Sequence, residues 1–196
     1  MNTIHITQGA GKMLGISSIN TPTSTNPFCK SMQKTNSVCK SCYAQRGESY
    51  RTGLIDAFSR NLFLTQRPLG LGEIPTINAT IFRFHSYGEL HNAQHLENYM
   101  TIAATKPHTI FTLWTKRKGI VQRVLKSRTK PDNMIIIYSS PLVDKQARLP
   151  KGFDKVFTVY SKGSAQDTAI NCHGSCNTCR LCYSHNDTTY INEIIK

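Results

Sequence analysis

Residues 80–138 carry the clearest pattern in the chain, TIFRFHSYGELHNAQHLENYMTIAATKPHTIFTLWTKRKGIVQRVLKSRTKPDNMIIIY. Short runs rich in β-branched and aromatic residues alternate here with segments of helical periodicity. The runs lie at 80–85, 109–114 and 134–138, and the helical segments at 93–104 and 118–126. Because strands alternate with helices over short links, we expect an α/β fold with a largely parallel sheet.

The flanking sequence extends this pattern in weaker form. One more strand is expected at 156–160, and a helix at 48–66 is stopped by Pro68. Residues 1–28 are rich in turn-forming residues, so only a short strand near 16–19 is expected there. Four or five strand–helix units are too few for a closed eight-stranded barrel. We expect a partial or open (β/α) barrel, with cysteine-rich N- and C-terminal segments, in a single domain spanning 1–196.

The expected compartment decides how the seven cysteines are interpreted. No apolar run approaches the roughly 18–20 residues that span a bilayer. The first residues lack a basic segment followed by an apolar one, so no secretory signal is expected. We therefore expect a cytoplasmic protein without membrane contact, in which thiols stay reduced. An odd number of cysteines also excludes a complete set of internal disulfides.

The cysteines form two groups near the ends of the chain, in the segments 29–42 and 172–182. The first group is Cys29, Cys39 and Cys42, and the second is Cys172, Cys176, Cys179 and Cys182. Successive two-residue gaps in the second group resemble the ferredoxin run that holds a [4Fe-4S] cluster. Structural zinc, which normally takes two close pairs, is the alternative. We interpret all seven cysteines as metal ligands.

The first group supplies only three thiolates, so a metal there is one ligand short. With an iron–sulfur cluster, the open iron could bind a substrate or cofactor. Alternatively, a histidine or a cysteine of the second group closes the site. One shared cluster and two separate clusters are therefore both open.

A polar segment follows the predicted strand at 80–85, where α/β sheets gather their ligands. Gly88 and Glu89 could present a carboxylate to an amine there, while Arg83 or His85 could meet a carboxylate. These four residues are candidate cofactor-binding residues. The alternative is an ordinary turn with a solvated Glu89.

The formal net charge of +13 favours a polyanionic partner such as nucleic acid. The basic stretch after the predicted strand at 109–114 could hold phosphates, with an aromatic ring to stack on a base. The candidate residues are Trp114, Lys116, Arg117, Lys118 and Arg123. The alternative is a basic surface that only keeps the protein dissolved.

Several of these motifs occur together in one known family. The motifs are Cys39-Lys-Ser-Cys42-Tyr-Ala, Gly47, the segment from Phe82 to Glu89, Trp114-Thr-Lys, and Cys176-x2-Cys179-x2-Cys182-Tyr. In this order the chain resembles the phage-encoded family catalogued as gene product eighty-eight. The resemblance implies a protein that acts in a bacterial host, and it implies little about activity.

More distantly, the chain resembles radical S-adenosylmethionine enzymes. This resemblance implies that Cys29, Cys39 and Cys42 hold an open cluster and that Glu89 contacts the amine of S-adenosylmethionine. The second cysteine group would then hold an auxiliary cluster. The family's usual spacing is Cys-x3-Cys-x2-Cys, whereas the first gap here is nine residues.

Two functions follow as hypotheses. The first is an iron–sulfur protein with one or two [4Fe-4S] clusters and radical S-adenosylmethionine-like redox chemistry. The alternative is a non-enzymatic iron–sulfur or zinc protein that binds nucleic acid or a host protein through its basic surface.

Overall fold

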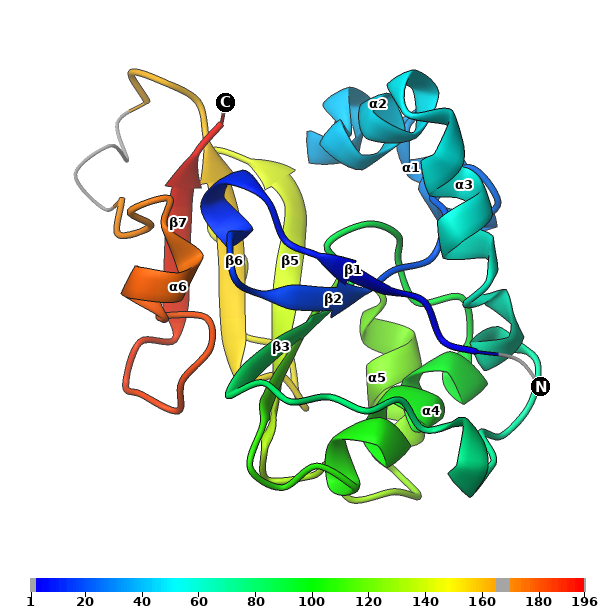
Figure 1. Ribbon diagram of the computed structural model, residues 1–196. Helices are drawn as coiled ribbons and strands as arrows, with labels where there is room; N and C mark the ends of the chain where they lie inside the picture. The colour runs from blue at the N-terminus through cyan, green and yellow to red at the C-terminus, as the bar shows by residue number, and fades with distance from the viewer. Residues whose placement is uncertain (1–2, 165–169, 196) are drawn as a thin grey trace.

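The computed structural model describes residues 3–164 and 170–195. One seven-stranded sheet runs through it, with its strands in chain order (Figure 1). The strands are β1 (Ile6–Gln8), β2 (Ser17–Ile19), β3 (Ile81–Phe84), β4 (Ile110–Thr115), β5 (Met134–Val143), β6 (Lys155–Tyr160) and β7 (Tyr190–Ile194). All neighbouring pairs of these strands are parallel except β1–β2. The expected α/β class with a largely parallel sheet is confirmed.

The helices are short, apart from one. They are α1 (Pro27–Met32), α2 (Tyr43–Tyr50), α3 (Thr52–Ser59), α4 (Ala93–Ala104), α5 (Lys118–Val124) and α6 (Cys176–Cys179), with 3₁₀ turns η1 (Gly11–Met13), η2 (Val38–Ser41), η3 (Leu62–Thr65) and η4 (Leu71–Glu73). Parallel strands need a crossover connection, and α4 and α5 supply it from β3 to β4 and from β4 to β5. No helix of the described residues is long and apolar enough to cross a membrane.

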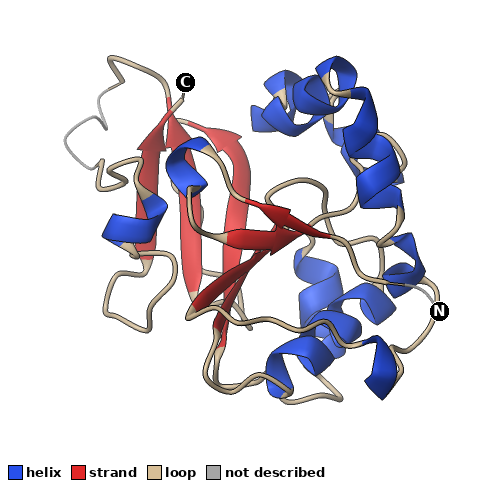
Figure 2. Ribbon diagram, in the orientation of Figure 1, coloured by secondary structure: helices blue, strands red, loops and turns tan. Residues whose placement is uncertain are grey.

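The two faces of the sheet are buried by different parts of the chain. Because successive side chains of a strand point to opposite faces, Phe82 and Phe84 of β3 pack with α4 and α5 in the larger core cluster. Ile135 and Ile137 of β5 point to the other face, in a second cluster. Figure 2 shows α4 and α5 together on one side of the strands. We call the face against α4 and α5 the helix face.

The opposite face is covered by segments from both ends of the chain. Met13 and Ile16 come from the η1 region, and Tyr183 comes from the C-terminal cysteine segment. Cys176 and Cys182 are partly buried against the same cluster. We call this face the cysteine face. It places the C-terminal cysteines against the sheet.

The predicted helix at 48–66 is wrong in its extent. Arg51, with φ −119° and ψ 87°, separates α2 from α3, and the 3₁₀ turn η3 replaces the end of the helix. Glu48 of α2 accepts backbone N–H bonds from Thr23 (2.6 Å) and Ser24 (3.1 Å). This long-range attachment fixes the direction of α2, and the non-helical Arg51 lets α3 take another direction. The tertiary contact of Glu48 therefore outweighs the apolar spacing that predicted one continuous helix.

The strands at both edges were not predicted. β1 pairs with the short predicted strand β2, and β7 follows the C-terminal cysteines and pairs with β6. β7 reads Tyr-Ile-Asn-Glu-Ile, which is short and half polar, so its signal in the sequence is weak. Helix α4, by contrast, has the predicted bounds.

Candidate functional site

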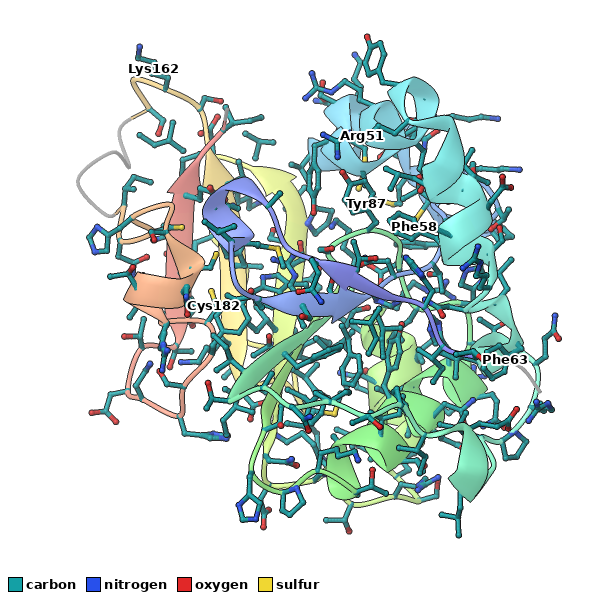
Figure 3. All side chains as sticks on the ribbon, viewed as in Figure 1. Arg51, Phe58, Phe63, Tyr87, Lys162 and Cys182 are labelled. Atoms are coloured by element: carbon teal, nitrogen blue, oxygen red, sulfur yellow. The ribbon has the colours of Figure 1, made fainter. Side chains whose placement is uncertain are left out.

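A cavity of about 550 Å³ lies where the parallel strands end. Six of the seven cysteines line it, together with the polar residues after β3 and β4; the lining includes Cys29, Cys39, Cys42, Cys172, Cys176, Cys182, Arg83, His85, Gly88, Glu89, Trp114 and Lys116. In Figure 3, Tyr87 and Phe58 lie on the side of α2 and α3, and Cys182 lies across the sheet from them. The fold thus brings the two ends of the chain to one cavity.

The N-terminal cysteines lie on three consecutive short elements. Cys29 is in α1, Cys39 is in η2, and Cys42 is the residue before α2. Asn26 caps α1 by accepting from the backbone N–H of Cys29 at 3.4 Å, and its Nδ2 donates to the carbonyl of Glu89 at 3.0 Å. One buried asparagine therefore attaches the cysteine segment to the turn after β3.

The electrostatic surroundings place these thiols close together and close to a lysine. Burial is the main cause that raises the pKa of Cys29, and Glu89 and Cys42 raise it further. Burial also raises the pKa of Cys39, while the ammonium group of Lys116 opposes the rise. Lys116 is itself half-buried, and its Nζ donates to Ser139 Oγ at 3.0 Å. The three thiols thus lie near one half-buried cation.

The C-terminal cysteines surround a pocket of their own. All four of them line a small pocket of about 20 Å³, and Cys179 lines this pocket without reaching the large cavity. Arg180, in the left-handed conformation (φ 53°), ends α6 and turns the chain back. The backbone N–H of Cys172 donates to the carbonyl of Asn192 at 3.1 Å, so β7 holds the start of the segment. Burial raises the pKa of Cys182 to about 12.

The two groups are electrostatically separate. The thiols that affect the pKa of Cys29 and Cys39 belong to the N-terminal group, and those that affect Cys176 and Cys182 belong to the C-terminal group. The fold therefore presents three thiols of each group to the large cavity, while Cys179 lines only the small pocket.

Neither group has the arrangement of a closed site for a single ion. Within residues 3–164 and 170–195, no three His, Cys, Asp or Glu side chains are placed to hold one metal ion. Thiolates that share a tetrahedral zinc lie about 3.8 Å apart, because each Zn–S bond is about 2.3 Å. A four-iron cluster is a larger body, and each thiolate binds a different corner of it. As placed, the thiols therefore form no single-ion site among the described residues.

Like Lys155, Arg83 is a buried cation of the cysteine face. Its side chain is on the opposite side of β3 from Phe82 and Phe84, and the residue is only 9% exposed. Nε donates to the carbonyl of His85 at 3.1 Å, Nη1 donates to Met13 Sδ at 3.3 Å, and the guanidinium lies 3.9 Å from the centre of the Trp114 ring. No carboxylate pairs with it in the described part of the chain.

The turn after β3 is built around Gly88 and Glu89. Gly88 has φ +90°, and a Cβ there would lie 2.3 Å from the carbonyl oxygen of Thr21. Glu89 is 5% exposed, so the alternative of a solvated carboxylate is wrong. Its Oε1 accepts from Leu90 N (2.8 Å) and Thr115 Oγ1 (2.5 Å), and its Oε2 accepts from Lys116 N (2.8 Å). The carboxylate therefore ties the end of β3 to the end of β4 at the cavity wall.

His85 belongs to a buried group of rings that the sequence did not reveal. It has φ +62°, and its Nε2 is 3.1 Å from the hydroxyl of Tyr99. His95 packs against both residues, edge-on to His85 and tilted to Tyr99, with ring centres 5.1 Å and 4.5 Å away. Burial lowers the pKa of His85 to about 3 and the pKa of His95 well below its usual range. Both imidazoles are therefore neutral at pH 7.

The basic stretch after β4 is divided between the cavity and the surface. Trp114 is 9% exposed and packs on Tyr183, so a base could reach its ring only from inside the cavity. Lys116 also lines the cavity. Arg117 donates to the carbonyl of Leu90 and lies over Phe28, and Lys118 lies over Tyr138. Arg123, the last of the five candidates, makes no comparable contact with a carbonyl, a ring or the cavity in the described residues. The stretch thus combines residues at the cavity wall with the exposed Lys118 and Arg123.

Two cavity residues from the chain ends were missed by the sequence reasoning. Lys12 and Glu193 form an ion pair of 2.8 Å at the cavity wall, although they are nearly a chain length apart. No local pattern marks such a pair. Tyr43 and Tyr87, whose ring centres are 5.7 Å apart, line the side of α2. Tyr43 directly follows Cys42, which is the signal that could have indicated it.

Fold and site together define an α/β protein with an open, mostly parallel sheet and two thiol groups at one cavity. The chain belongs to the Gene product 88 family, whose model matches residues 5–192. The family resemblance expected from the ordered motifs is confirmed. The chain matches none of the curated proteins and none of the solved structures with which it was compared.

Proposed function

We propose that the protein binds two [4Fe-4S] clusters, one through Cys29, Cys39 and Cys42 and the other through the four C-terminal cysteines. The observation that supports the proposal is the grouping of the thiols: Cys29, Cys39 and Cys42 line the large cavity, and the four C-terminal cysteines line a small pocket that adjoins it through Cys172, Cys176 and Cys182. Four thiolates complete the ligation of a cubane, whereas three leave one iron open. This arrangement favours two clusters over one shared cluster.

The open three-thiol site faces a space large enough for a small ligand. Cavities of roughly 300–1,000 Å³ hold small molecules in proteins, and this cavity has about 550 Å³. We infer that the ligand is S-adenosylmethionine and that the protein is an enzyme of the radical type on a partial barrel. Three features support this inference: the strands follow chain order, the three cysteines follow the first parallel strand, and Gly88-Glu89 follows the next one.

In this proposal, the open cluster supplies one electron to the bound cofactor. The chain's own residues position the ligand and keep water out. Glu89 keeps unused acceptor capacity on Oε2, so it can receive the amine of the ligand without leaving Lys116 N. Trp114 and Tyr87 bound the cavity with aromatic surface. Lys116 stabilises the thiolates of Cys39 and Cys42.

The alternative function, nucleic-acid or host-protein binding through the basic surface, has less support in this geometry. Trp114 and Lys116 point into the cavity, and Arg117 and Lys118 have local contacts. The high positive charge remains the argument for that alternative. It predicts an affinity for DNA or RNA that falls steeply with salt.

The deciding experiment measures iron and acid-labile sulfide in protein prepared without oxygen. We expect about eight irons per chain, with matching sulfide, because two cubanes are present. The paired variant Cys39→Ala/Cys42→Ala and the paired variant Cys179→Ala/Cys182→Ala should each lose about half of the iron. Ser41→Ala, between two of the proposed ligands, is the matched control and should lose none. Zinc without sulfide, or loss of all the iron in either paired variant, would contradict the proposal.

The enzyme part has its own test. Reduced, cluster-loaded protein with S-adenosylmethionine should form methionine and deoxyadenosine, and Cys39→Ala/Cys42→Ala should form neither. Spectra of the three-thiol cluster should also change when the cofactor is added. If neither products nor spectral changes appear in protein with full iron content, the enzyme inference fails and the cluster proposal stands.

A further inference from the structure

We propose that Arg83 is the counter-charge of the four-thiol cluster and raises its reduction potential. The inference rests on the proposed function, because it assigns a partner to a cluster that the proposal places at the C-terminal cysteines. It concerns a residue on the central strand β3, far in sequence from those cysteines.

The first observation is that Arg83 is buried without an anionic partner. The ion pairs of the described residues join other groups, namely Lys12–Glu193, Arg67–Glu73, Arg128–Glu97 and Lys130–Asp154. Its contacts are a carbonyl, a thioether sulfur, an indole ring and the phenol of Tyr183, none of which carries a charge at neutral pH. A buried charge that lacks a charged partner is energetically unfavourable. A negative group is therefore expected beside Arg83 in the working protein.

The second observation is which groups surround the guanidinium. Arg83 contacts Met13 and Trp114, and Tyr183 packs on Trp114. These three residues belong to one apolar cluster, against which Cys176 and Cys182 are packed. Tyr183 directly follows Cys182 in the chain. Arg83, Cys176 and Cys182 also line the same cavity. The cation thus lies on the sheet face that the C-terminal thiols cover.

The charge of the cluster supplies the missing partner. Four thiolates on a doubly positive four-iron core leave a net negative body, and one-electron reduction makes that body more negative by one charge. A buried guanidinium stabilises the more negative form more strongly, since Coulomb interactions are larger away from water. Indole packing and the Met13 contact fix the guanidinium in place. Arg83 is therefore a positioning residue that acts through electrostatics.

The test measures the one-electron reduction of the four-thiol cluster by EPR at controlled potentials. It uses the Cys39→Ala/Cys42→Ala background, in which only the four-thiol cluster is expected. Arg83→Gln should lower the equilibrium constant for reduction at least tenfold, which corresponds to a shift of about 59 mV to lower potential. Arg83→Lys, which keeps the charge, should shift it less. Iron, sulfide and urea unfolding are measured for every variant.

Each outcome has a defined meaning. A shift in Arg83→Gln that Arg83→Lys largely restores supports the proposal, as does loss of the cluster in Arg83→Gln alone. An unchanged potential in a fully loaded Arg83→Gln protein overturns it and leaves the cluster proposal intact. Equal effects of Gln and Lys also overturn it, because they indicate packing rather than charge. Absence of iron and sulfide from the background protein, when the C-terminal cysteines are intact, overturns both.

Discussion

At the scale of single residues, the site depends on a few positions that accept only one type of amino acid. Gly88 is the sharpest case, because φ +90° and the nearby carbonyl of Thr21 both exclude a side chain. The next residue, Glu89, uses both carboxylate oxygens to join the ends of β3 and β4. Backbone conformation at one residue thus sets the position of the carboxylate at the cavity.

Gly88→Ala should destabilise the protein by more than about 1 kcal/mol, because the left-handed conformation and the 2.3 Å approach to Thr21 both penalise a methyl group. Urea unfolding measures the change. Gly119→Ala is the matched control: it lies in helix α5 with nothing within 4 Å of its Cβ position. The control should be neutral or stabilise by up to about 1 kcal/mol. Equal effects of the two substitutions would contradict the assignment.

At the scale of elements, the N-terminal cysteine segment is held by polar attachments rather than by a large apolar face. α1 and η2 have no buried residue, and α2 buries only Ala44 and Glu48 of its described residues. Glu48 and Asn26 connect this segment to the backbone of the 20–24 region and of Glu89. The three cysteines are thus carried by elements that a bound cluster would further stabilise.

Glu48→Ala should loosen α2 because it leaves the N–H groups of Thr23 and Ser24 without their acceptor. The expected cost is about 1–3 kcal/mol in urea unfolding, and the N-terminal cysteines should lose iron before the C-terminal ones. Ser49→Ala, the next residue along the same helix, removes only a local bond to the carbonyl of Arg46 and is the control. Stability and iron content equal to those of the control would contradict this role of Glu48.

At the scale of the whole molecule, the buried histidines connect stability to pH. His85 and His95 are neutral in the folded protein because burial lowers their pKa values. In the unfolded chain they take up protons near pH 6.5. The unfolded state therefore binds more protons below that pH, and stability is lost as the pH falls from about 6.5 towards 3.

The free energy of unfolding should accordingly fall between pH 6.5 and pH 4.5 by up to about 1.4 kcal/mol per pH unit for each of these histidines. His95→Leu, which removes only the long hydrogen bond of 3.5 Å from His91 N to Nδ1, should flatten this slope. His108→Gln, at an exposed position, is the control and should leave the slope unchanged. Urea unfolding at a series of pH values checks both. An unaltered slope in His95→Leu would show that the acid sensitivity has another origin.

The sequence by itself determined the class of the fold, the bounds of α4, most central strands, and the division of the cysteines into two groups. These depend on local patterns: strand–helix alternation, apolar periodicity and cysteine spacing. The sequence did not predict the edge strands or the break at Arg51. Both depend on contacts between residues that are far apart in the chain, namely the strand partners and the attachment of Glu48.

Only the tertiary structure decided that both cysteine groups share one cavity and that Arg83 is buried beside the second group. It also turned Trp114 and Lys116 inward and brought Lys12 to Glu193. The physical reason is the same in each case. Parallel strands gather their carboxyl ends at one edge of a sheet, and the two ends of the chain then cover its open face, so neighbours there are set by packing and charge rather than by sequence distance.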